Sequence, residues 1–270
     1  MPELPEVETI VRDLDRLIVG ATIREVGIVH ADLIDGDPAE FARALRDRRI
    51  KGVSRRAKNI VIDLGTDRLV VNLGMTGRLL VVDPADPPPS HPGVRFELED
   101  GRLLLYHDVR RFGRLALLTA DAWAARDRDL GYEPLSDEFT ADALLKLARR
   151  SRVAVKTWLM DQRRIVGVGN IYASEALFRA GIDPRRPANS LKPREARRLQ
   201  AAIQAVLREA IEFRGTTLLD YRDASGEQGR FADRLRVYDR EDQPCRVCGT
   251  PILRIVQGGR STFYCPRCQK

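Results

Sequence analysis

The segment CRVCGTPILRIVQGGRSTFYCPRC, residues 245–268, contains every cysteine of the chain and decides how its C-terminal end folds. Two Cys-x2-Cys pairs are separated by sixteen residues. Each pair can present two thiolates from one tight turn, and two such turns at the end of a hairpin form a tetrahedral, all-sulfur zinc site. Two disulfides or free thiols are the alternative, which is disfavoured in a cytosolic chain without other cysteines. We therefore predict one structural, non-catalytic Zn2+ ion, bound by Cys245, Cys248, Cys265 and Cys268.

The residues before this segment have the periodicity of helices. Apolar residues recur at helical spacing in four stretches, 137–149, 153–161, 170–180 and 193–214. Pro193 suits the first turn of the last stretch, and Gly215 suits the position just after its end. The polar, proline-containing segment LGYEPLSDEFT, residues 130–140, is interpreted as an interdomain linker.

The N-terminal half has the pattern of a β-rich domain. An amphipathic helix is expected at 5–19, followed by Gly20. Alternating or wholly apolar runs, typical of strands, occupy 60–64, 69–73, 79–82, 94–98, 103–107 and 115–118. The proline-rich stretch 83–93 is expected to be a loop. We predict an α+β protein of two domains, the first an antiparallel β-sandwich with an N-terminal helix.

The charge of the chain is unevenly distributed. Overall, 46 basic and 39 acidic residues among 270 give a net charge of +7. Residues 1–150 carry 23 basic and 26 acidic side chains, a balance of −3, whereas residues 151–270 carry 23 and 13, a balance of +10. A basic half favours a polyanionic partner, nucleic acid ahead of a membrane, although an arginine-rich solvated surface is the alternative. Because no apolar run reaches the length of a membrane span and the N-terminus is acidic, we expect a soluble, cytoplasmic protein.

The N-terminal sequence MPELPE offers a nucleophile. Removal of Met1 leaves Pro2 as a secondary amine, and α-amino groups have a pKa of roughly 7.7–8.0, well below that of lysine. Such an amine can attack an electrophilic carbon and form a Schiff base. Glu3 beside it and Glu6 one helical turn later are candidate acid/base partners. Ordinary helix capping by a proline and early acidic residues is the alternative interpretation.

Five blocks together carry a family resemblance: PELPEVE (2–8), GMTG (74–77), RRFG (110–113), VGVGNIYASEALF (166–178) and FYCPRCQK (263–270). In this order and spacing they resemble the bacterial formamidopyrimidine-DNA glycosylases over the whole chain. The endonuclease VIII branch usually begins PEGPE, so Leu4 and the RRFG block favour the formamidopyrimidine branch.

The resemblance implies a domain organisation. A catalytic β-sandwich is expected over residues 1–130 and a linker over 131–140. A helix–two-turn–helix domain that includes a lesion-recognition loop is expected over 141–234, and a zinc-finger hairpin over 235–270. The protein is expected to be a monomer that acts on damaged duplex DNA in the bacterial nucleoid.

The resemblance also implies a mechanism. Pro2 attacks C1′ of the damaged nucleotide, releases the base and holds the sugar as an imine, while Glu3 protonates the ring oxygen and shuttles protons. β-Elimination and δ-elimination then cut the strand on both sides of the abasic site. Lys58 and the zinc-finger residue Arg260 match family residues that contact the phosphates at the lesion, and they complete the expected catalytic set.

The expected DNA contacts have two roles. Met75, Arg110 and Phe112 match the side chains that fill the gap left by the flipped base, and Arg110 pairs with the orphaned cytosine. Asn170, at a helix start, matches a phosphate contact. The remaining expected contacts are Glu6, His91, Lys156, Tyr172, Thr216 and Tyr221.

The sequence departs from the family at a few positions and leaves two other functions open. Relatives often have a second histidine where this chain has Gly93, and Leu219 and Asp220 replace basic or neutral polar residues in the loop Thr216–Gly229, which reads the damaged base in relatives. One alternative is an enzyme for oxidised pyrimidines. The other is a non-catalytic zinc-ribbon DNA-binding protein, against which the intact Pro2-Glu3 pair argues.

Overall fold

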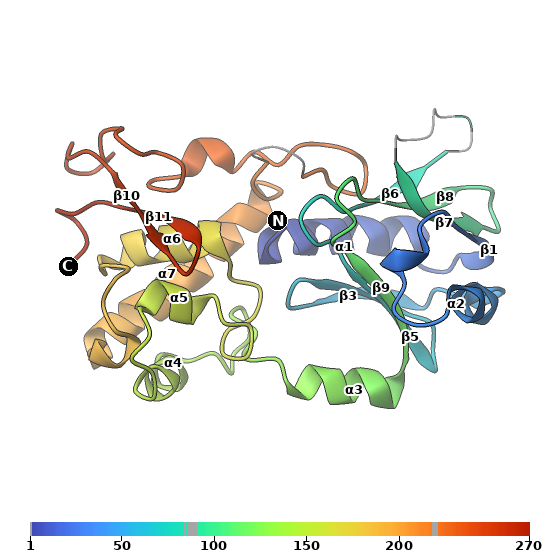
Figure 1. The fold of residues 1–270 in the computed structure, drawn as a ribbon, viewed down its shortest axis with the longest axis horizontal. Helices are drawn as coiled ribbons and strands as arrows, with labels where there is room; N and C mark the ends of the chain where they lie inside the picture. Colours follow the sequence, from blue (N-terminus) through green and yellow to red (C-terminus); the bar gives the residue numbers. More distant parts are fainter. Residues whose placement is uncertain (1, 84, 86–90, 218–220) are drawn as a thin grey trace. The chain divides into compact units, whose positions relative to one another are not determined.

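The computed structural model describes residues 2–83, 85, 91–217 and 221–270, and its contacts divide the chain into two compact units (Figure 1). Unit 1 comprises residues 1–128 and 213–230, and unit 2 comprises residues 129–212 and 231–270. Segment 213–230 therefore makes its contacts with the N-terminal unit, whereas the sequence grouped it with the helical domain that surrounds it in the chain.

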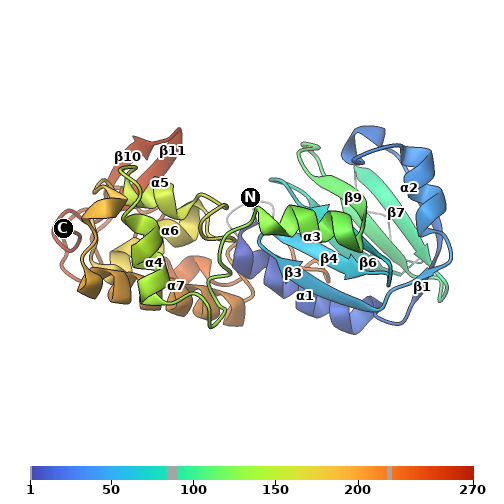
Figure 2. The ribbon, with the colours of Figure 1, turned by 90° about the horizontal axis from the view of Figure 1, so that it is seen from below.

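Unit 1 begins with helix α1, Leu4–Ile18, as predicted. Pro5 stands in its first turn, where the missing amide hydrogen costs no helical hydrogen bond. The buried face of α1 includes Val7, Ile10 and Leu14, which join the hydrophobic core of the unit. Figure 2 shows α1 running beside strand β3 (Gly52–Arg56).

Two antiparallel sheets form the body of unit 1 and confirm the predicted sandwich. Their buried side chains, such as Ile62, Leu69 and Phe96, belong to one core cluster. The five-stranded sheet has the order β2 (Arg48–Arg49), β1 (Thr22–Ile28), β7 (Pro92–Leu98), β8 (Leu103–His107) and β6 (Arg78–Val82). The four-stranded sheet has the order β3, β4 (Asn59–Asp63), β5 (Asp67–Asn72) and β9 (Arg114–Thr119).

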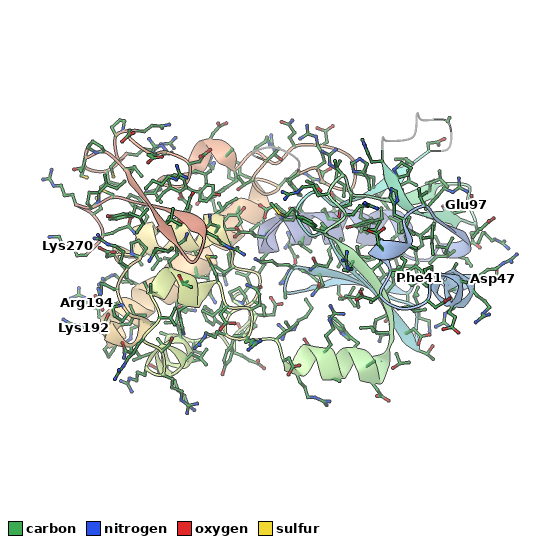
Figure 3. All side chains as sticks on the ribbon, viewed as in Figure 1. Phe41, Asp47, Glu97, Lys192, Arg194 and Lys270 are labelled. Atoms are coloured by element: carbon green, nitrogen blue, oxygen red, sulfur yellow. The ribbon has the colours of Figure 1, made fainter. Side chains whose placement is uncertain are left out.

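Three further helical segments of unit 1 were not predicted. The 3-10 turn η1 spans Ala31–Leu33, and helix α2 spans Pro38–Leu45 with Asp37 as its N-cap. Phe41 of α2, labelled in Figure 3, is buried. Helix α3, Ala120–Arg128, has no buried residue and so lacks the apolar periodicity by which helices are recognised in a sequence.

Unit 2 is built on four α-helices and a hairpin. The helices are α4 (Ala141–Ala148), α5 (Val155–Leu159), α6 (Asn170–Ala180) and α7 (Pro193–Glu212). Helix α7 packs against α4 and α6, and α6 also packs against strand β11 (Arg260–Tyr264), which pairs with β10 (Leu253–Gln257). Two 3-10 turns complete the unit, η2 (Ala188–Ser190) and η3 (Ala232–Arg234).

Segment 213–230 leaves α7 at two residues with positive φ, Arg214 at 59° and Gly215 at 81°. Its ends lie together, because the Arg230 amide donates to the Phe213 carbonyl at 2.8 Å. Its middle is anchored in unit 1, where Ala224 is fully buried in the core. Within the described part of the chain, no helix has the length and hydrophobicity needed to cross a membrane.

Candidate active site and nucleic-acid interface

The N-terminus of α1 gathers the predicted catalytic residues Pro2 and Glu3. Both are buried, as is Glu6 at 2% exposure. One carboxylate oxygen of Glu6 accepts the Glu3 amide at 2.8 Å, and the other accepts the Thr216 amide at 2.7 Å. Glu6 therefore fixes the backbone next to Pro2 and, at the same time, the start of the predicted recognition loop.

The described part of the recognition loop lies against the same helix. The hydroxyl of Tyr221 donates to the backbone carbonyl of Glu6 at 3.3 Å, and burial raises the pKa of this phenol. Thr216 and Tyr221 are both buried. To act as the predicted DNA contacts, they would have to bind DNA through backbone atoms or after the loop has moved. Leu219 and Asp220 lie outside the described residues.

Lys58 occupies the turn between β3 and β4. The preceding Ala57 has a positive φ of 57°, and the guanidinium of Arg55 donates to its carbonyl at 2.9 Å. The strand after the turn is held by the Asn72 amide, which donates to Asn59 Oδ1 at 2.9 Å. The predicted phosphate contact is thus carried by a short hairpin whose two strands belong to the four-stranded sheet.

The GMTG and RRFG blocks meet on one buried carboxylate, Asp108, which is 2% exposed. Its Oδ1 accepts the Thr76 hydroxyl at 2.5 Å and the Arg110 amide at 3.2 Å. Its Oδ2 accepts the Gly113 amide at 2.8 Å and the Tyr106 hydroxyl at 3.3 Å. Asp108 therefore fastens the two predicted gap-filling loops to each other, although sequence reasoning did not single it out.

The side chains on these loops are exposed although two of them are apolar. Met75 is 38% and Phe112 is 54% exposed, and the Arg110 guanidinium lies 4.6 Å from the Phe112 ring centroid. Gly74 has a φ of 57°, and a Cβ there would lie 2.6 Å from the backbone of Gly113. Only a glycine permits this close approach of the two loops. The exposure of these side chains is compatible with the predicted entry into a DNA stack.

His91 directly precedes β7, has a positive φ of 61° and is exposed. Its ring lies edge-on to that of His107, with centroids 6.0 Å apart. His107 is buried, and burial, Arg78 and His91 together lower its pKa. A Cβ on Gly93 would lie 2.5 Å from Leu33 Cδ1, so a histidine at this position would require the Leu33 side chain to move. His107 was not predicted, since LLLYH has only the pattern of a buried strand.

In unit 2, Asn170 is the first residue of α6, and its side chain is held by Lys156. The ammonium of Lys156 donates to Asn170 Oδ1 at 2.5 Å, to the Ser261 carbonyl at 2.9 Å and to the Thr262 hydroxyl at 2.7 Å. Lys156 is 1% exposed. Its predicted role in DNA binding is therefore indirect, through Asn170 and through the strand that begins with Arg260.

Two other buried side chains organise unit 2. Tyr172, predicted as a DNA contact, is fully buried beside Phe231, with ring centroids 6.0 Å apart. Glu175 is also fully buried, and its carboxylate accepts the backbone amides of Arg236, Val237 and Tyr238 at 2.9–3.0 Å. This carboxylate, which was not predicted, fastens the segment that precedes the zinc-finger cysteines to α6.

Arg260 is exposed at the start of β11, directly after a turn formed by two glycines. Gly258 and Gly259 have φ values of 55° and 73°, so the tight turn relies on residues without a Cβ. The hairpin thus projects the predicted phosphate-binding guanidinium at its tip.

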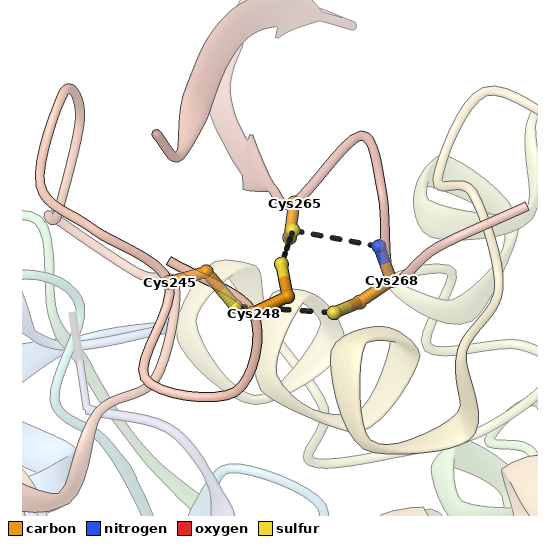
Figure 4. A group of neighbouring side chains, drawn as sticks. All are labelled: Cys245, Cys248, Cys265 and Cys268. Atoms are coloured by element: carbon orange, nitrogen blue, oxygen red, sulfur yellow. Dashed lines mark hydrogen bonds between the residues drawn. The ribbon is translucent and has the colours of Figure 1, made fainter. Parts of the chain in front are cut away.

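The four cysteines form the predicted metal site (Figure 4). Their sulfur atoms all lie within 4.8 Å of one another, and Cys248 and Cys265 are 3.5 Å apart. Four ligands at about 2.3 Å from a tetrahedral Zn2+ would be about 3.8 Å apart, so the arrangement fits one zinc ion. Hydrogen bonds with Thr250 lower the pKa of Cys248 to about 6, whereas burial raises those of Cys265 and Cys268. A bound cation would keep all four as thiolates.

Comparison with known families divides the chain into three matching regions. Residues 1–115 match the formamidopyrimidine-DNA glycosylase N-terminal domain, and residues 130–221 match the formamidopyrimidine-DNA glycosylase H2TH domain. Residues 242–270 match a zinc finger found in FPG and IleRS.

Similar proteins cover the whole chain. It is 46% identical over 274 residues to the formamidopyrimidine-DNA glycosylase of Herpetosiphon aurantiacus and 45% identical over 272 residues to that of Serratia proteamaculans, with 100% of each chain covered. The crystal structure of the MutM (Fpg) protein from Thermus thermophilus is similar at a TM-score of 0.89 and 43% identity, covering 99% of this chain and 98% of that one. Lactococcus lactis Fpg in complex with abasic-site DNA is similar at a TM-score of 0.92 and 32% identity, covering 99% of both.

Proposed function

Because the chain belongs to the formamidopyrimidine-DNA glycosylase family, we propose that it is a bifunctional DNA glycosylase and AP lyase. Its substrates are 8-oxoguanine and formamidopyrimidines in duplex DNA. The observation that carries this proposal is the N-terminus of α1, where Pro2 and Glu3 are buried and Glu6 binds the Glu3 backbone. A DNA-binding protein without catalysis needs no such arrangement. The enzyme works as a monomer on nucleoid DNA in the cytoplasm.

Pro2 is the nucleophile once Met1 has been removed. It lies at the N-terminal end of α1, where the helix dipole disfavours a positive charge and so favours the neutral amine. The amine lone pair attacks C1′ and the bond from C1′ to the base breaks. The departing base takes up the proton that the Pro2 nitrogen loses, and it leaves as a neutral heterocycle. Glu3 donates a proton to the sugar ring oxygen, the ring opens, and Pro2 and C1′ form an iminium.

Strand cleavage follows from the iminium. Loss of the C2′ proton expels the 3′ phosphate by β-elimination, and loss of a further proton expels the 5′ phosphate by δ-elimination. The iminium acts as the electron sink in both steps, so one amine serves excision and cleavage. Glu3 is the proton carrier beside it.

The exposed loops of unit 1 support base flipping. Removing the damaged base from the stack costs a few kcal/mol, less for a damaged base, and an apolar wedge offsets part of this cost. Met75 and Phe112 supply the wedge, and Arg110 donates hydrogen bonds to the cytosine left without a partner. Asp108 keeps the two loops at a fixed separation.

Polar and basic residues of both units bind the phosphates. Lys58 and His91 act from unit 1, whereas Asn170 and Arg260 act from unit 2. Zinc, when bound, cross-links the turns Cys245–Cys248 and Cys265–Cys268 and so holds the hairpin that carries Arg260. No step of the reaction uses the metal, because four cysteines leave no open coordination position.

Borohydride trapping tests this function. The protein is incubated with duplexes that contain 8-oxoguanine opposite cytosine, thymine glycol opposite adenine, or an abasic site, and intact mass first establishes that Met1 is absent. We expect a covalent adduct with 8-oxoguanine and abasic DNA. The Pro2→Gly variant should give a weaker adduct, because its primary α-amine replaces the proline amine, and it should bind DNA normally. Preference for thymine glycol would favour an enzyme for oxidised pyrimidines. If no duplex gave an adduct, the remaining interpretation would be a non-catalytic DNA-binding protein.

A further inference from the structure

Arg214, two residues after the end of α7, has a backbone conformation that an arginine rarely adopts. Its φ is 59°, in the left-handed region that favours glycine. The side chain supplies a reason for this conformation. Its Nη2 lies 2.5 Å from Asp13 Oδ2 and 2.5 Å from Asp223 Oδ2, and its Nε lies 2.9 Å from the same Asp223 oxygen. One guanidinium thus bridges two carboxylates that are far apart in the sequence.

The two carboxylates belong to the two structures that Arg214 connects. Asp13 lies on α1, the helix that begins beside Pro2, and its side chain is 10% exposed. Asp223 lies in the returning half of segment 213–230, and its side chain is 1% exposed. The second oxygen of Asp223 accepts the amides of Ser225 and Glu227 at 3.0 and 2.9 Å, so this carboxylate also shapes the segment.

The group has two carboxylates for one guanidinium, and the carboxylates are buried more deeply than the guanidinium. Burial opposes the charge of the guanidinium, but hydrogen bonds to Asp223 and Asp13 leave the pKa of Arg214 raised overall. Hydrogen bonds between charged partners are stronger than neutral ones, and a buried carboxylate that loses its partner is strongly disfavoured. Removing Arg214 would leave Asp223 buried beside Asp13 without a compensating charge.

This bridge adds to the attachments that Glu6 makes between the loop and α1. The Glu6 carboxylate accepts the Thr216 amide at 2.7 Å, and the Glu6 backbone carbonyl accepts the Tyr221 hydroxyl at 3.3 Å. Gly215 permits the contact between Glu6 and Thr216, because a Cβ at its position would lie 2.9 Å from the Glu6 side chain. The loop is therefore fixed to α1 near the nucleophile by Glu6 and further along the helix by Asp13.

We propose that Asp13, Arg214 and Asp223 form an ion clamp that positions the recognition loop for excision of the damaged base. Arg214 is a positioning residue of this clamp, and the inference rests on the function proposed above. Excision requires the loop to hold an intact damaged base, whereas cleavage at an abasic site has no base to hold. Loss of the clamp therefore slows the first reaction and spares the second.

Single-turnover kinetics on two duplexes of identical flanking sequence test the clamp, one with 8-oxoguanine and one with an abasic site. The Arg214→Gly variant suits the test because glycine keeps the positive φ without strain. We expect its excision rate to fall roughly 10- to 100-fold, the range for losing hydrogen bonds between charged groups, while abasic-site cleavage changes less than about threefold. Arg214→Lys should restore part of the excision rate, since it keeps the charge without the two-pronged geometry.

Two further variants keep the test decisive. Asp13→Asn removes the charge of one of the two carboxylates that bind Arg214 and leaves the Arg214–Asp223 pair. We therefore expect its excision rate to fall less than that of Arg214→Gly. Arg12→Gln removes an exposed ion pair with Glu8 on the same helix and should change neither reaction. If the reaction rate of Arg214→Gly fell equally on both duplexes, or fell on neither, the proposed positioning role of the clamp would be refuted. A wild-type protein that cannot be trapped on abasic DNA would instead refute the proposed function itself.

Discussion

The buried residues that hold the predicted functional residues are mostly carboxylates in unit 1, whereas unit 2 uses both the carboxylate of Glu175 and the ammonium of Lys156. In unit 1 the anchors are carboxylates, Glu6, Asp108 and Asp223, which accept backbone amides. In unit 2 the anchor nearest the phosphate-binding residues is Lys156, which donates to a carbonyl, an amide oxygen and a hydroxyl. Counted by unit, unit 1 has 23 basic and 24 acidic residues, whereas unit 2 has 23 and 15, a balance of +8.

This difference assigns separate tasks to the two units. In the proposed reaction, unit 1 positions the Pro2 amine and the wedge side chains, and its acidic anchors add no positive charge beside the proposed nucleophile. Unit 2 has both its anchors and an excess of basic over acidic residues. This positive charge attracts DNA and makes DNA binding dependent on salt. Substitutions at the anchors should therefore impair chemistry in unit 1 and affinity in unit 2.

The largest effect is expected from the zinc site. Cys248→Ser should remove the metal and unfold the hairpin that carries Arg260, because the free energy of zinc binding, on the order of 10 kcal/mol, is coupled to folding. DNA affinity and zinc content would be measured together on the purified protein. Trapping on abasic DNA at saturating protein should survive, since Pro2 is in unit 1. Normal DNA affinity without zinc would contradict the structural role of the metal.

The next effect concerns Lys156. Lys156→Met keeps the length and bulk of the side chain but leaves three buried acceptors without their donor, at a cost of about 3 kcal/mol. We expect weaker DNA binding, less dependence on salt, and a kcat near that of the wild type at saturating DNA. Lys192→Met, at a position outside this network, is the matched control. A fall in kcat with unchanged affinity would assign Lys156 to the chemistry instead.

A smaller effect is expected at Asp108. The two carboxylate oxygens of Asp108 accept four hydrogen bonds. Asp108→Asn replaces one of these oxygens by an amide group that cannot accept, which should cost about 2 kcal/mol of stability because the carboxylate is buried and charged. The gap-filling loops should separate, so excision from duplex DNA slows while cleavage of abasic single-stranded DNA, which has no gap to fill, is retained. Thr119→Val, outside these loops, serves as the control. Equal slowing on both substrates would mean that Asp108 supports the fold alone.

The smallest effect is a difference in acid sensitivity between the units. The folded-state pKa of His107 lies below 6.5, so the unfolded state takes up the proton first and stability falls as the pH drops below about 6.5, by at most about 1.4 kcal/mol per pH unit. The neighbours that set this pKa are Arg78, His91 and Asp108. In unit 2, by contrast, Arg186 holds the pKa of Glu195 at about 2, so that pair stabilises the fold until far lower pH.

Urea unfolding at pH 7.5 and 5.5 measures this difference. His107→Gln should lose less stability than the wild type between the two pH values, by up to about 1 kcal/mol. Glu195→Gln should lower stability at both values by about 1 kcal/mol, after allowance for solvent screening. The same pH dependence in the wild type and His107→Gln would show that this histidine is not the acid-sensitive group.

The sequence predicted the elements whose pattern is local. Helix α1, the core strands and the cysteine site all follow from periodicity or spacing within short stretches. Helix α3 escaped prediction because it buries nothing, and α2 because only Phe41 and Leu45 of its eight residues are buried.

The sequence blocks predicted the residues that are proposed to carry out the chemistry. They did not predict the buried residues that hold those residues in place. Asp108, Glu175 and Arg214 each act on partners supplied by folding, and nothing in their neighbouring residues marks them as anchors. Lys156 and Tyr172 differ from these anchors, because the family resemblance predicted both as DNA contacts. In the folded protein, both side chains are buried. A sequence pattern records residue types at positions and not the depth at which each side chain lies.

The assignment of segment 213–230 to unit 1 has a consequence for how the protein can be divided. The chain passes between the units three times, after residues 128, 212 and 230. A protease that cuts at the first crossing therefore separates residues 1–128 from residues 129–270, and only noncovalent contacts with segment 213–230 would keep the first fragment in place. A fragment ending at residue 128 would lack Tyr221 and Ala224 of its own core. The catalytic unit is thus a spatial module that no continuous piece of the gene encodes.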